Sequence, residues 1–332
     1  MSWKKIRKNL YTAEDSCRIY CLKSGDRGLL IDSGSGKSLS GVKDLGISGI
    51  DWVLHTHPHR DMSLGDFDLI SEGTRFAVPA AAEKLFSEAE AGWKDRNTYY
   101  AFDYGDKYAM PLRDIPVHQA LKEGDTFDWE GFSLKVMETP GHTDYHMSFL
   151  LELEGDRLIF SGDLIHSEGR VWEMDALQGT YEEFIQDEQT IRKVPALISS
   201  IDRIRDLSSD LLLPGHGEPI SDTDSALQEL KKNLVEMMDY LPAEAYLNDY
   251  LVTHPDIDAL LCCQASYLIR NNEGKHLLID AGFVDSVMED HPGILLEWIQ
   301  NRDGFEGLDL IIPTHYHCDH IAATNAFVRQ WG

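Results

Sequence analysis

The chain has 332 residues, of which 42% are hydrophobic and 26% charged, a composition typical of a globular protein with one large or two modest domains. Lys and Arg number 30 against 57 Asp and Glu, and the resulting net charge of −27 argues against nucleic acid or an anionic membrane as a partner. The five cysteines form no CxxC pair, no apolar run approaches the ~18 residues of a membrane span, and no signal-peptide core follows the basic N-terminus. We therefore expect a cytoplasmic protein.

Short segments rich in aliphatic residues and bounded by Gly or Asp predict buried β-strands in the first half of the chain. They cover residues 17–23, 28–34, 51–57 and 132–139. The segment 146–163 holds two apolar runs around a Glu-Gly-Asp turn, which predicts a β-hairpin.

Helices are expected between and after these strands, so the predicted class is mixed α/β. One helix is expected over 79–91, with Pro79 at its first position, and another after Thr180, which forms a capping-box pattern with Glu183. From residue 221 onward an apolar stripe at three- and four-residue steps predicts an amphipathic helix, its members being Leu227, Leu230, Leu234 and Met237.

The beginning of the chain recurs near its end. GLLIDSG at 28–34 returns as HLLIDAG at 276–282, and GIDWVLHTHPHRDM at 49–62 returns as GLDLIIPTHYHCDH at 307–320. We expect a first domain over 1–248 and the N-terminal part of a second, similar domain over 249–332, with the boundary among the breakers of YLNDYLVTHPD. Only 17 residues follow His315, so the second copy is expected to be incomplete.

Four segments of the first copy place metal-ligand side chains in loops after apolar runs. The first segment holds His57, His59 and Asp61 at two-residue spacing, so one loop can turn two imidazoles and a carboxylate toward one point. The other three segments are TPGHT, FSGD and LLPGHG, which carry His142, Asp163 and His216. Four imidazoles and two carboxylates together predict a metal centre.

This ordered set resembles that of the metallo-β-lactamase superfamily, whose pattern is THxHxDH followed by a His, an Asp and a last His, each in a loop after a strand. The resemblance spans roughly residues 17–240 and implies an αββα sandwich, with helices outside two facing sheets and metals at one edge. It implies that one zinc ion is bound by His57, His59 and His142, and a second by Asp61, Asp163 and His216, with Asp163 bridging both. Three neutral imidazoles leave a position open for water, as in catalytic zinc sites.

The sequence departs from that pattern at Met62, which stands where the last His of the motif belongs. A thioether is a weak, soft ligand for a borderline dication, so we expect one firmly bound zinc and a second site that is weak, empty or completed by water. His55, His146 and His166 lie close to the motifs, and each is either a replacement ligand or an ordinary surface or supporting histidine.

The second copy keeps the complete motif but no downstream ligand segments. Its ligand-type residues are His315, His317, Asp319 and His320. Cys318 among them is expected to be a small buried residue.

The resemblance implies a zinc-dependent hydrolase in which metal-bound hydroxide attacks an ester, thioester, lactone, amide, β-lactam or phosphodiester bond while Asp61 orients or deprotonates the water. The expected partner is a small-molecule substrate, beside either a homo-oligomer or pairing with a second domain copy. Two alternatives remain: a degenerate domain with a scaffold or regulatory role beside a catalytic copy, or an iron-dependent oxidoreductase on the same fold. The aromatic segment within 80–130 either covers the metal as a substrate-selecting loop or anchors a surface excursion.

Overall fold

The computed structural model describes residues 2–95, 110–173, 193–240, 251–253, 259–262, 266–281, 299–301, 305–315, 318–321 and 323–331. The chain divides into two compact units, Met1–Tyr240 and Leu241–Gly332. The division into two domains of one kind at 248/249 stays a prediction. The helix expected after Thr180 lies outside the described residues.

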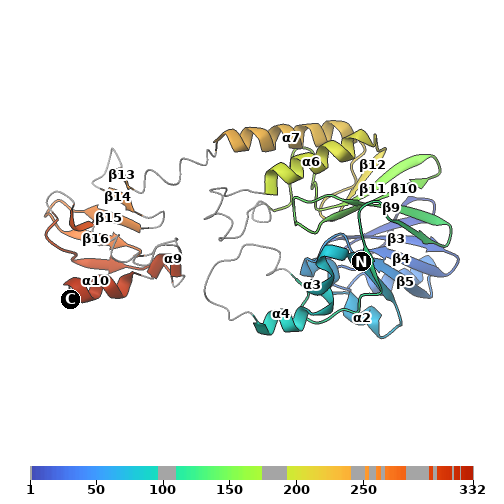
Figure 1. The fold of residues 1–332 in the computed structure, drawn as a ribbon, viewed down its shortest axis with the longest axis horizontal. Helices are drawn as coiled ribbons and strands as arrows, with labels where there is room; N and C mark the ends of the chain where they lie inside the picture. The colour runs from blue at the N-terminus through green and yellow to red at the C-terminus, as the bar shows by residue number, and fades with distance from the viewer. Residues whose placement is uncertain are drawn as a thin grey trace. The chain divides into compact units, whose positions relative to one another are not determined.

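The first sheet of the first unit has seven strands in chain order (Figure 1). They are β1 (Lys4–Arg7), β2 (Leu10–Glu14), β3 (Arg18–Ser24), β4 (Arg27–Ile31), β5 (Gly49–Leu54), β6 (Arg75–Pro79) and β7 (Gln119–Leu121). The first four pair antiparallel, and β4 to β7 pair parallel. Parallel neighbours need crossovers, which run through η1 (Leu39–Leu45), α1 (Arg60–Ser63) and α2 (Asp66–Ile70). The carboxyl ends of β4, β5 and β6 therefore meet at one edge.

The second sheet has the order β12-β11-β10-β9-β8. Its strands are β8 (Thr126–Trp129), β9 (Phe132–Glu138), β10 (Met147–Leu153), β11 (Asp156–Gly162) and β12 (Leu211–Pro214). The hairpin predicted over 146–163 is confirmed as β10 and β11, which pair antiparallel. Between β11 and β12, which pair parallel, the described chain includes α6 (Lys193–Asp206).

Three apolar clusters define the layers of the first unit. The central cluster joins the inward faces of the two sheets, where the rings of Tyr20 and Phe160 meet edge to face at 5.4 Å. A second cluster lies on the outer face of the first sheet, where Val53 and Phe86 are buried. A third lies between the second sheet and two helices, α6 and α7 (Thr223–Tyr240). The αββα sandwich predicted for this part of the chain is confirmed.

The amphipathic helix predicted from residue 221 is confirmed as α7, but the single helix predicted over 79–91 is wrong. Pro79 ends strand β6, and three short pieces follow, η2 (Ala80–Ala82), α3 (Glu83–Ser87) and α4 (Ala89–Asp95). The chain leaves the helical conformation at Glu88, whose φ of −125° and ψ of 27° separate α3 from α4. This break follows Phe86, which is buried in the outer cluster of the first sheet.

The second unit contains one described sheet, of order β13-β14-β15-β16-β17. Its strands are β13 (Leu251–Thr253), β14 (Ala259–Cys262), β15 (Ser266–Arg270), β16 (His276–Ile279) and β17 (Leu310–Ile312), and two helices follow, α9 (Cys318–Ile321) and α10 (Thr324–Trp331). A small cluster that includes Leu268, Leu278 and Phe327 joins one face of this sheet to α10.

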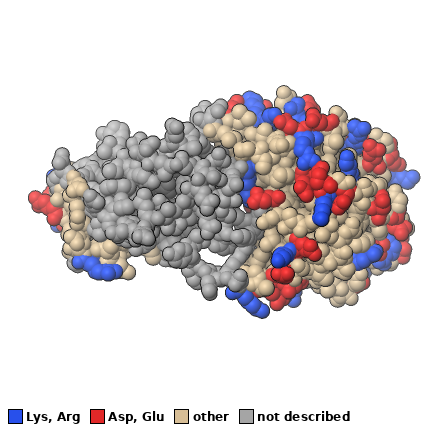
Figure 2. All heavy atoms as spheres, in the orientation of Figure 1, with Lys and Arg blue, Asp and Glu red and all other residues tan. Residues whose placement is uncertain are grey.

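Charged side chains of both signs are interspersed over the visible face of the first unit (Figure 2). Within the ranges given above, every helix is too short or too polar to cross a lipid bilayer. The expectations of a cytoplasmic location and of no nucleic acid partner stay predictions.

Candidate metal centre

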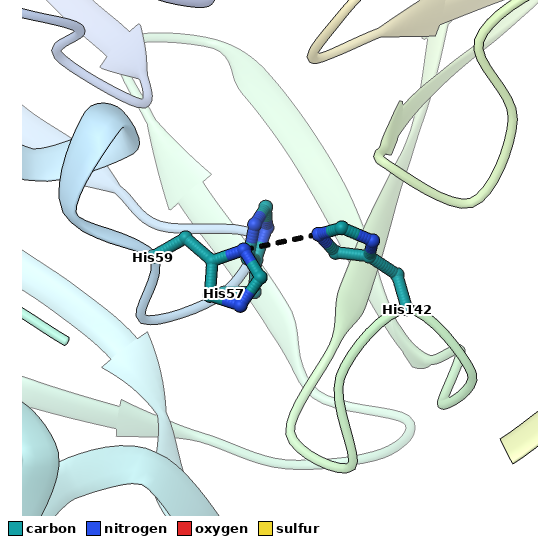
Figure 3. A group of neighbouring side chains, drawn as sticks. All are labelled: His57, His59 and His142. Atoms are coloured by element: carbon teal, nitrogen blue, oxygen red, sulfur yellow. Dashed lines mark hydrogen bonds between the residues drawn. The ribbon is translucent and has the colours of Figure 1, made fainter. Parts of the chain in front are cut away.

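Three buried histidines converge where strand-end loops of the first unit meet (Figure 3). His57 follows β5, His59 directly precedes α1, and His142 lies in the loop between β9 and β10. One ligand nitrogen from each lies within 4.8 Å of the others, and His59 Nδ1 is 3.0 Å from His142 Nε2. Nitrogens bound tetrahedrally to one zinc ion lie roughly 3.4 Å apart, so this spacing is close to that of a metal site.

One ring nitrogen of His57 makes a hydrogen bond and the other makes none. Thr56 Oγ1 donates to Asp32 Oδ2 at 2.9 Å and lies 2.9 Å from His57 Nδ1. Because the hydroxyl has a single proton, the hydrogen of the second bond must come from His57 Nδ1. His57 Nε2 therefore carries a lone pair, and it is buried with no hydrogen-bond partner; Asp163 Oδ2 is 3.6 Å away. A buried polar atom without a partner is costly, and a bound metal would satisfy it.

The residues expected at a second metal lie beside these histidines. Asp163 Oδ2 is 3.3 Å from His142 Nε2, and Asp163 Oδ1 is 2.9 Å from His216 Nδ1. His216 Nε2 is in turn 3.1 Å from Asp61 Oδ2. The structure thus brings together all six ligand residues predicted for the first copy, with Asp163 between the two groups. Their roles as ligands stay predictions.

The surroundings fix the charge of several of these groups. Burial, reinforced by the neighbouring histidines, lowers the pKa of His57 and of His142 well below the ordinary value, so both are neutral and able to bind a cation. Burial also disfavours charged His216, but its hydrogen bonds to Asp163 and Asp61 prevail and raise its pKa to about 10. Burial raises the pKa of Asp163. Burial also disfavours the ionised form of Asp61, but the hydrogen bond to His216 and the charges of His216 and His59 together prevail and lower its pKa.

Met62 is fully buried, and its methyl group lies against the loop that carries His216. A Cβ placed on Gly215 would lie 2.8 Å from both Met62 Cε and Asp163 Oδ1, so a larger residue there would have to displace these two side-chain ends. The apolar side chain of Met62, which stands where the motif has an imidazole, therefore reaches the space beside Asp163.

His55, considered above as a replacement ligand, is instead enclosed between two carboxylates. Its Nδ1 is 3.2 Å from Asp32 Oδ1 and its Nε2 is 2.8 Å from Asp66 Oδ2, and all three side chains are buried. Burial disfavours the charged imidazole, but the two carboxylates prevail and raise the pKa of His55 to about 10. The sequence analysis did not predict this arrangement of His55 between Asp32 and Asp66. Its one indication in the sequence was a histidine at the end of an apolar strand.

His146 is also engaged at both ring nitrogens. The backbone N–H of Asp163 donates to its Nε2 at 3.0 Å, which leaves Nδ1 as the donor in the 2.9 Å contact with Thr139 Oγ1. His146 therefore supports the loop of Asp163. His166 lies three residues after Asp163 in the sequence, and its Nδ1 is 3.1 Å from Ser167 Oγ.

An aromatic stack covers His216. The ring of Trp172 lies parallel to that of His216, with centroids 4.2 Å apart, and the ring of His166 stacks on the same Trp172 at 5.4 Å. Trp172 remains 44% exposed and faces a cavity of about 270 Å³. The cavity is lined by His59, Arg60, Asp61, Leu64, Asp163, Trp172 and Glu173. Sequence reasoning missed Trp172, which lies outside the ligand motifs.

The aromatic segment of 80–130 is described only at its two ends. Trp93 Nε1 donates to the carbonyl of Pro111 at 2.8 Å, which ties the ends together. The segment also contains Tyr99, Tyr100, Phe102 and Tyr104, which lie outside the described residues.

The corresponding loop of the second unit contains part of a similar arrangement. The rings of His315 and His320 have centroids 3.9 Å apart, and His320 Nδ1 is 2.7 Å from Asp280 Oδ2. His317 lies outside the described residues, as do the side chains of Cys318 and Asp319. The ligand set of this loop and the burial of Cys318 stay predictions.

The chain belongs to the metallo-β-lactamase superfamily, because the model of that family matches residues 13–216 and 262–332. The fold agrees with this assignment. The metallo-β-lactamase MIM-1 of Novosphingobium pentaromativorans superposes with a TM-score of 0.57 at 17% identity, covering 74% of this chain and 92% of that one.

Two curated relatives show what kinds of protein resemble this chain. The Beta-lactamase-like protein 2 homolog of Drosophila melanogaster is 27% identical over 209 residues, 61% of this chain and 59% of the relative. The Atrochrysone carboxyl ACP thioesterase of Aspergillus fumigatus is 28% identical over 218 residues, 63% of this chain and 53% of the relative. The match thus spans between half and three-fifths of the length of these relatives.

Proposed function

We propose that the first unit is a zinc-dependent hydrolase that acts on a small-molecule thioester or related ester. The observation that carries the proposal is the buried, unpartnered Nε2 of His57 beside the imidazoles of His59 and His142. Neutral imidazoles at this spacing fit zinc and leave a position for water. The thioester class is supported by the relatives from Aspergillus fumigatus and Passalora fulva that are named as ACP thioesterases.

When bound, zinc supplies a Lewis acid that activates water and polarises the oxygen of the bond to be cleaved. The residues of the chain then supply position and proton transfer. Asp61 lines the cavity, and its lowered pKa keeps the carboxylate ionised near neutrality, so it can accept a proton from the attacking water. His216 holds Asp61 Oδ2 at 3.1 Å and so orients this carboxylate. The exposed part of Trp172 offers an apolar wall for an acyl group.

Elemental analysis of the purified chain, together with a panel of thioester, ester, lactone, β-lactam, amide and phosphodiester substrates, tests this proposal. We expect about one tightly held zinc per chain and hydrolysis that a chelator abolishes and added zinc restores. His57→Ala should lose both zinc and activity. The matched control is His118→Ala, because His118 is an exposed histidine of the same unit. Full zinc content in the His57 variant would overturn the metal assignment.

The alternatives make different predictions in the same experiment. Met62, which withdraws an imidazole from the motif, favours the scaffold or regulatory interpretation. That interpretation predicts no tightly held metal and no hydrolysis of any substrate in the panel. An iron-dependent oxidoreductase would instead contain iron and would change oxidation state with its substrate.

A further inference from the structure

A buried series of hydrogen bonds leads from His57 away from the metal centre. His57 Nδ1 lies 2.9 Å from Thr56 Oγ1, which donates to Asp32 Oδ2 at 2.9 Å. Asp32 Oδ1 in turn lies 3.2 Å from His55 Nδ1, and His55 Nε2 lies 2.8 Å from Asp66 Oδ2. All five residues are at most 1% exposed. Bulk water therefore does not compete for these bonds, and the side chains themselves set their direction.

The direction of the bonds decides which nitrogen of His57 carries the hydrogen. A hydroxyl has one proton, so Thr56 accepts from His57 Nδ1 only while it donates to Asp32. If Asp32 held a proton and donated to Thr56, Thr56 would donate to His57 Nδ1, and the hydrogen of His57 would move to Nε2. A protonated Nε2 has no lone pair for a cation. The metal-binding form of His57 therefore requires that Asp32 act only as an acceptor.

Donors contact both oxygens of Asp32. The backbone N–H of Thr56 donates to Oδ1 at 3.0 Å, and the hydroxyl of Thr56 donates to Oδ2. His55 adds an imidazole donor at Oδ1, and its other ring nitrogen contacts Asp66, which fixes the orientation of the ring. The ring of Phe86 packs beside the same imidazole, with centroids 5.0 Å apart. His55 thus supplies a donor that favours the acceptor form of Asp32.

The second unit has the same series of bonds, with an imidazole from a different position. Asp280 Oδ2 accepts from Thr314 Oγ1 at 2.8 Å, and Thr314 Oγ1 lies 3.0 Å from His315 Nδ1. The imidazole at Asp280 is that of His320, whose Nδ1 lies 2.7 Å from Asp280 Oδ2. An imidazole therefore contacts the aspartate in both units.

The positions of these two imidazoles are complementary. His320 is the last histidine of its motif, and the first unit has Met62 at that position, which offers no donor. At the position of His55 the second unit has Pro313, which offers no donor either. Each unit thus has a histidine at one of the two positions, and that histidine contacts the aspartate.

We propose that His55 is a positioning residue that replaces the last histidine of the motif as the imidazole donor to Asp32 and so keeps His57 in its metal-binding form. Asp66 holds the His55 ring in place for this role. The role of His55 rests on the proposed function in one respect, namely that the free nitrogen of His57 binds the metal.

Nitrogen-15 NMR of the histidine rings in the metal-free chain at pH 7 tests this role without zinc. The signals of His57 are assigned by their loss in His57→Ala. We expect the wild-type His57 to carry its hydrogen on Nδ1 alone, and His55→Leu to show a second form of His57 with the hydrogen on Nε2. Zinc titration against a competing chelator should show an affinity about tenfold lower in His55→Leu.

A conservative variant separates the loss of the donor from the loss of a buried ring. His55→Asn places an amide N–H two bonds from Cβ, as Nδ1 of histidine is, so it can still donate to Asp32. It should keep the wild-type form of His57 and the wild-type zinc affinity. The matched control is His118→Leu, at an exposed histidine of the same unit, which should change neither quantity.

Rescue from the other position is the second test. Met62→His in the His55→Leu background should restore the form of His57 with the hydrogen on Nδ1, because the new imidazole can donate to Asp32 as the last histidine does in the second unit. NMR of the metal-free chain reads this rescue independently of any second zinc ion.

The outcomes distinguish the role of His55 from the proposed function. A folded His55→Leu variant in which His57 keeps its hydrogen on Nδ1 alone overturns the proposal, as does failure of Met62→His to restore that form. If circular dichroism shows that His55→Leu is unfolded, His55→Leu combined with Asp66→Leu takes its place, because it leaves no buried carboxylate of Asp66 without its partner. A wild-type chain that binds no zinc would overturn the proposed function, and the NMR result would still decide the role of His55.

Discussion

Replacing Met62 with histidine is expected to add a second zinc site to the first unit. Met62 Cε reaches the neighbourhood of Asp163 Oδ1, since one Cβ placed on Gly215 would lie 2.8 Å from each atom. An imidazole in this place would join Asp61, Asp163 and His216, which already contact one another. Zinc content should rise from about one toward two ions per chain.

The second unit indicates how the new imidazole would be oriented. There His320 Nδ1 lies 2.7 Å from Asp280 Oδ2, which also accepts a bond from Thr314 Oγ1 at 2.8 Å. In the first unit Asp32 Oδ2 accepts one bond, from Thr56 Oγ1. A carboxylate oxygen can accept two, so a histidine at position 62 can donate to Asp32 Oδ2 through Nδ1 and keep Nε2 for a metal.

The effect of Met62→His is measured as the change in the free energy of unfolding, with and without zinc. Removing the fully buried thioether from the apolar cluster costs about 1.5–3 kcal/mol, and a hydrogen bond to Asp32 returns about 1 kcal/mol. Without zinc the variant should therefore be about 0.5–2 kcal/mol less stable than the wild type. Zinc at 100 times the dissociation constant of the new site adds about 2.7 kcal/mol, which is enough to reverse the order.

Zinc titration against a competing chelator and urea unfolding at matched zinc concentrations provide the two measurements. Met62→Leu is the control, because it keeps an apolar side chain of similar volume and offers no ligand. Its zinc content should equal that of the wild type. Two tightly bound zinc ions in the wild type would refute the reasoning. Catalytic activity need not rise, since a second cation can occupy space that the substrate uses.

Three further predictions concern the surroundings of the site. Thr56→Val should weaken zinc binding about 10- to 100-fold because His57 Nδ1 loses its acceptor, while Thr56→Ser should bind like the wild type; equal zinc affinity in both variants would contradict this. Trp172→Ala should raise KM for thioesters with a bulky acyl group about tenfold and leave zinc content unchanged, whereas an unchanged KM would remove Trp172 from the substrate site. Partial burial raises the pKa of Asp15, but hydrogen bonds from Ser35, Ser16 and Ser38 prevail and lower it below the ordinary 3.8. Its contribution to stability is therefore present above about pH 4 and lost as the pH falls through the folded-state pKa, so the destabilisation by Asp15→Ala in urea unfolding should shrink between pH 7 and pH 3.

The positions of the ligand residues could be predicted because each follows an apolar strand. His57 comes after β5, Asp163 after β11 and His216 after β12, and loops after parallel neighbours meet at the same edge of a sheet. The order of the motifs then indicated the sandwich and its edge site. No long-range contact had to be known for this part of the prediction.

Contacts between distant side chains could not be predicted in this way. Trp172 stacks on His216 although α6 and β12 lie between them in the sequence, and neither residue belongs to a periodic pattern that indicates the contact. The helix predicted over 79–91 failed for a related reason. Its composition favours a helix, but Pro79 completes strand β6 and the chain breaks at Glu88, after the buried Phe86.

The loop that carries the first histidine of the motif, His57 or His315, has the same backbone arrangement in both units. Asp32 and Asp280 both have a left-handed φ, 56° and 55°, which is uncommon for a residue other than glycine. Each accepts hydrogen bonds from the backbone N–H and the hydroxyl of a threonine, Thr56 or Thr314. In both loops that hydroxyl also contacts Nδ1 of the next residue, a histidine. The aspartate thus fixes the first histidine of the motif in each unit.

The two loops differ in the imidazole that reaches this aspartate. In the second unit it is His320, and Pro313 and Thr324 stand where the first unit has His55 and Asp66. In the first unit the imidazole that contacts Asp32 is that of His55, which directly follows β5. The other ring nitrogen of His55 contacts the carboxylate of Asp66. Asp32 therefore has an imidazole partner without a histidine at position 62, and the apolar Met62 fills that position in the core. The contact of His55 with Asp32 thus preserves the support of His57 in a loop whose motif has Met62 in place of its last histidine.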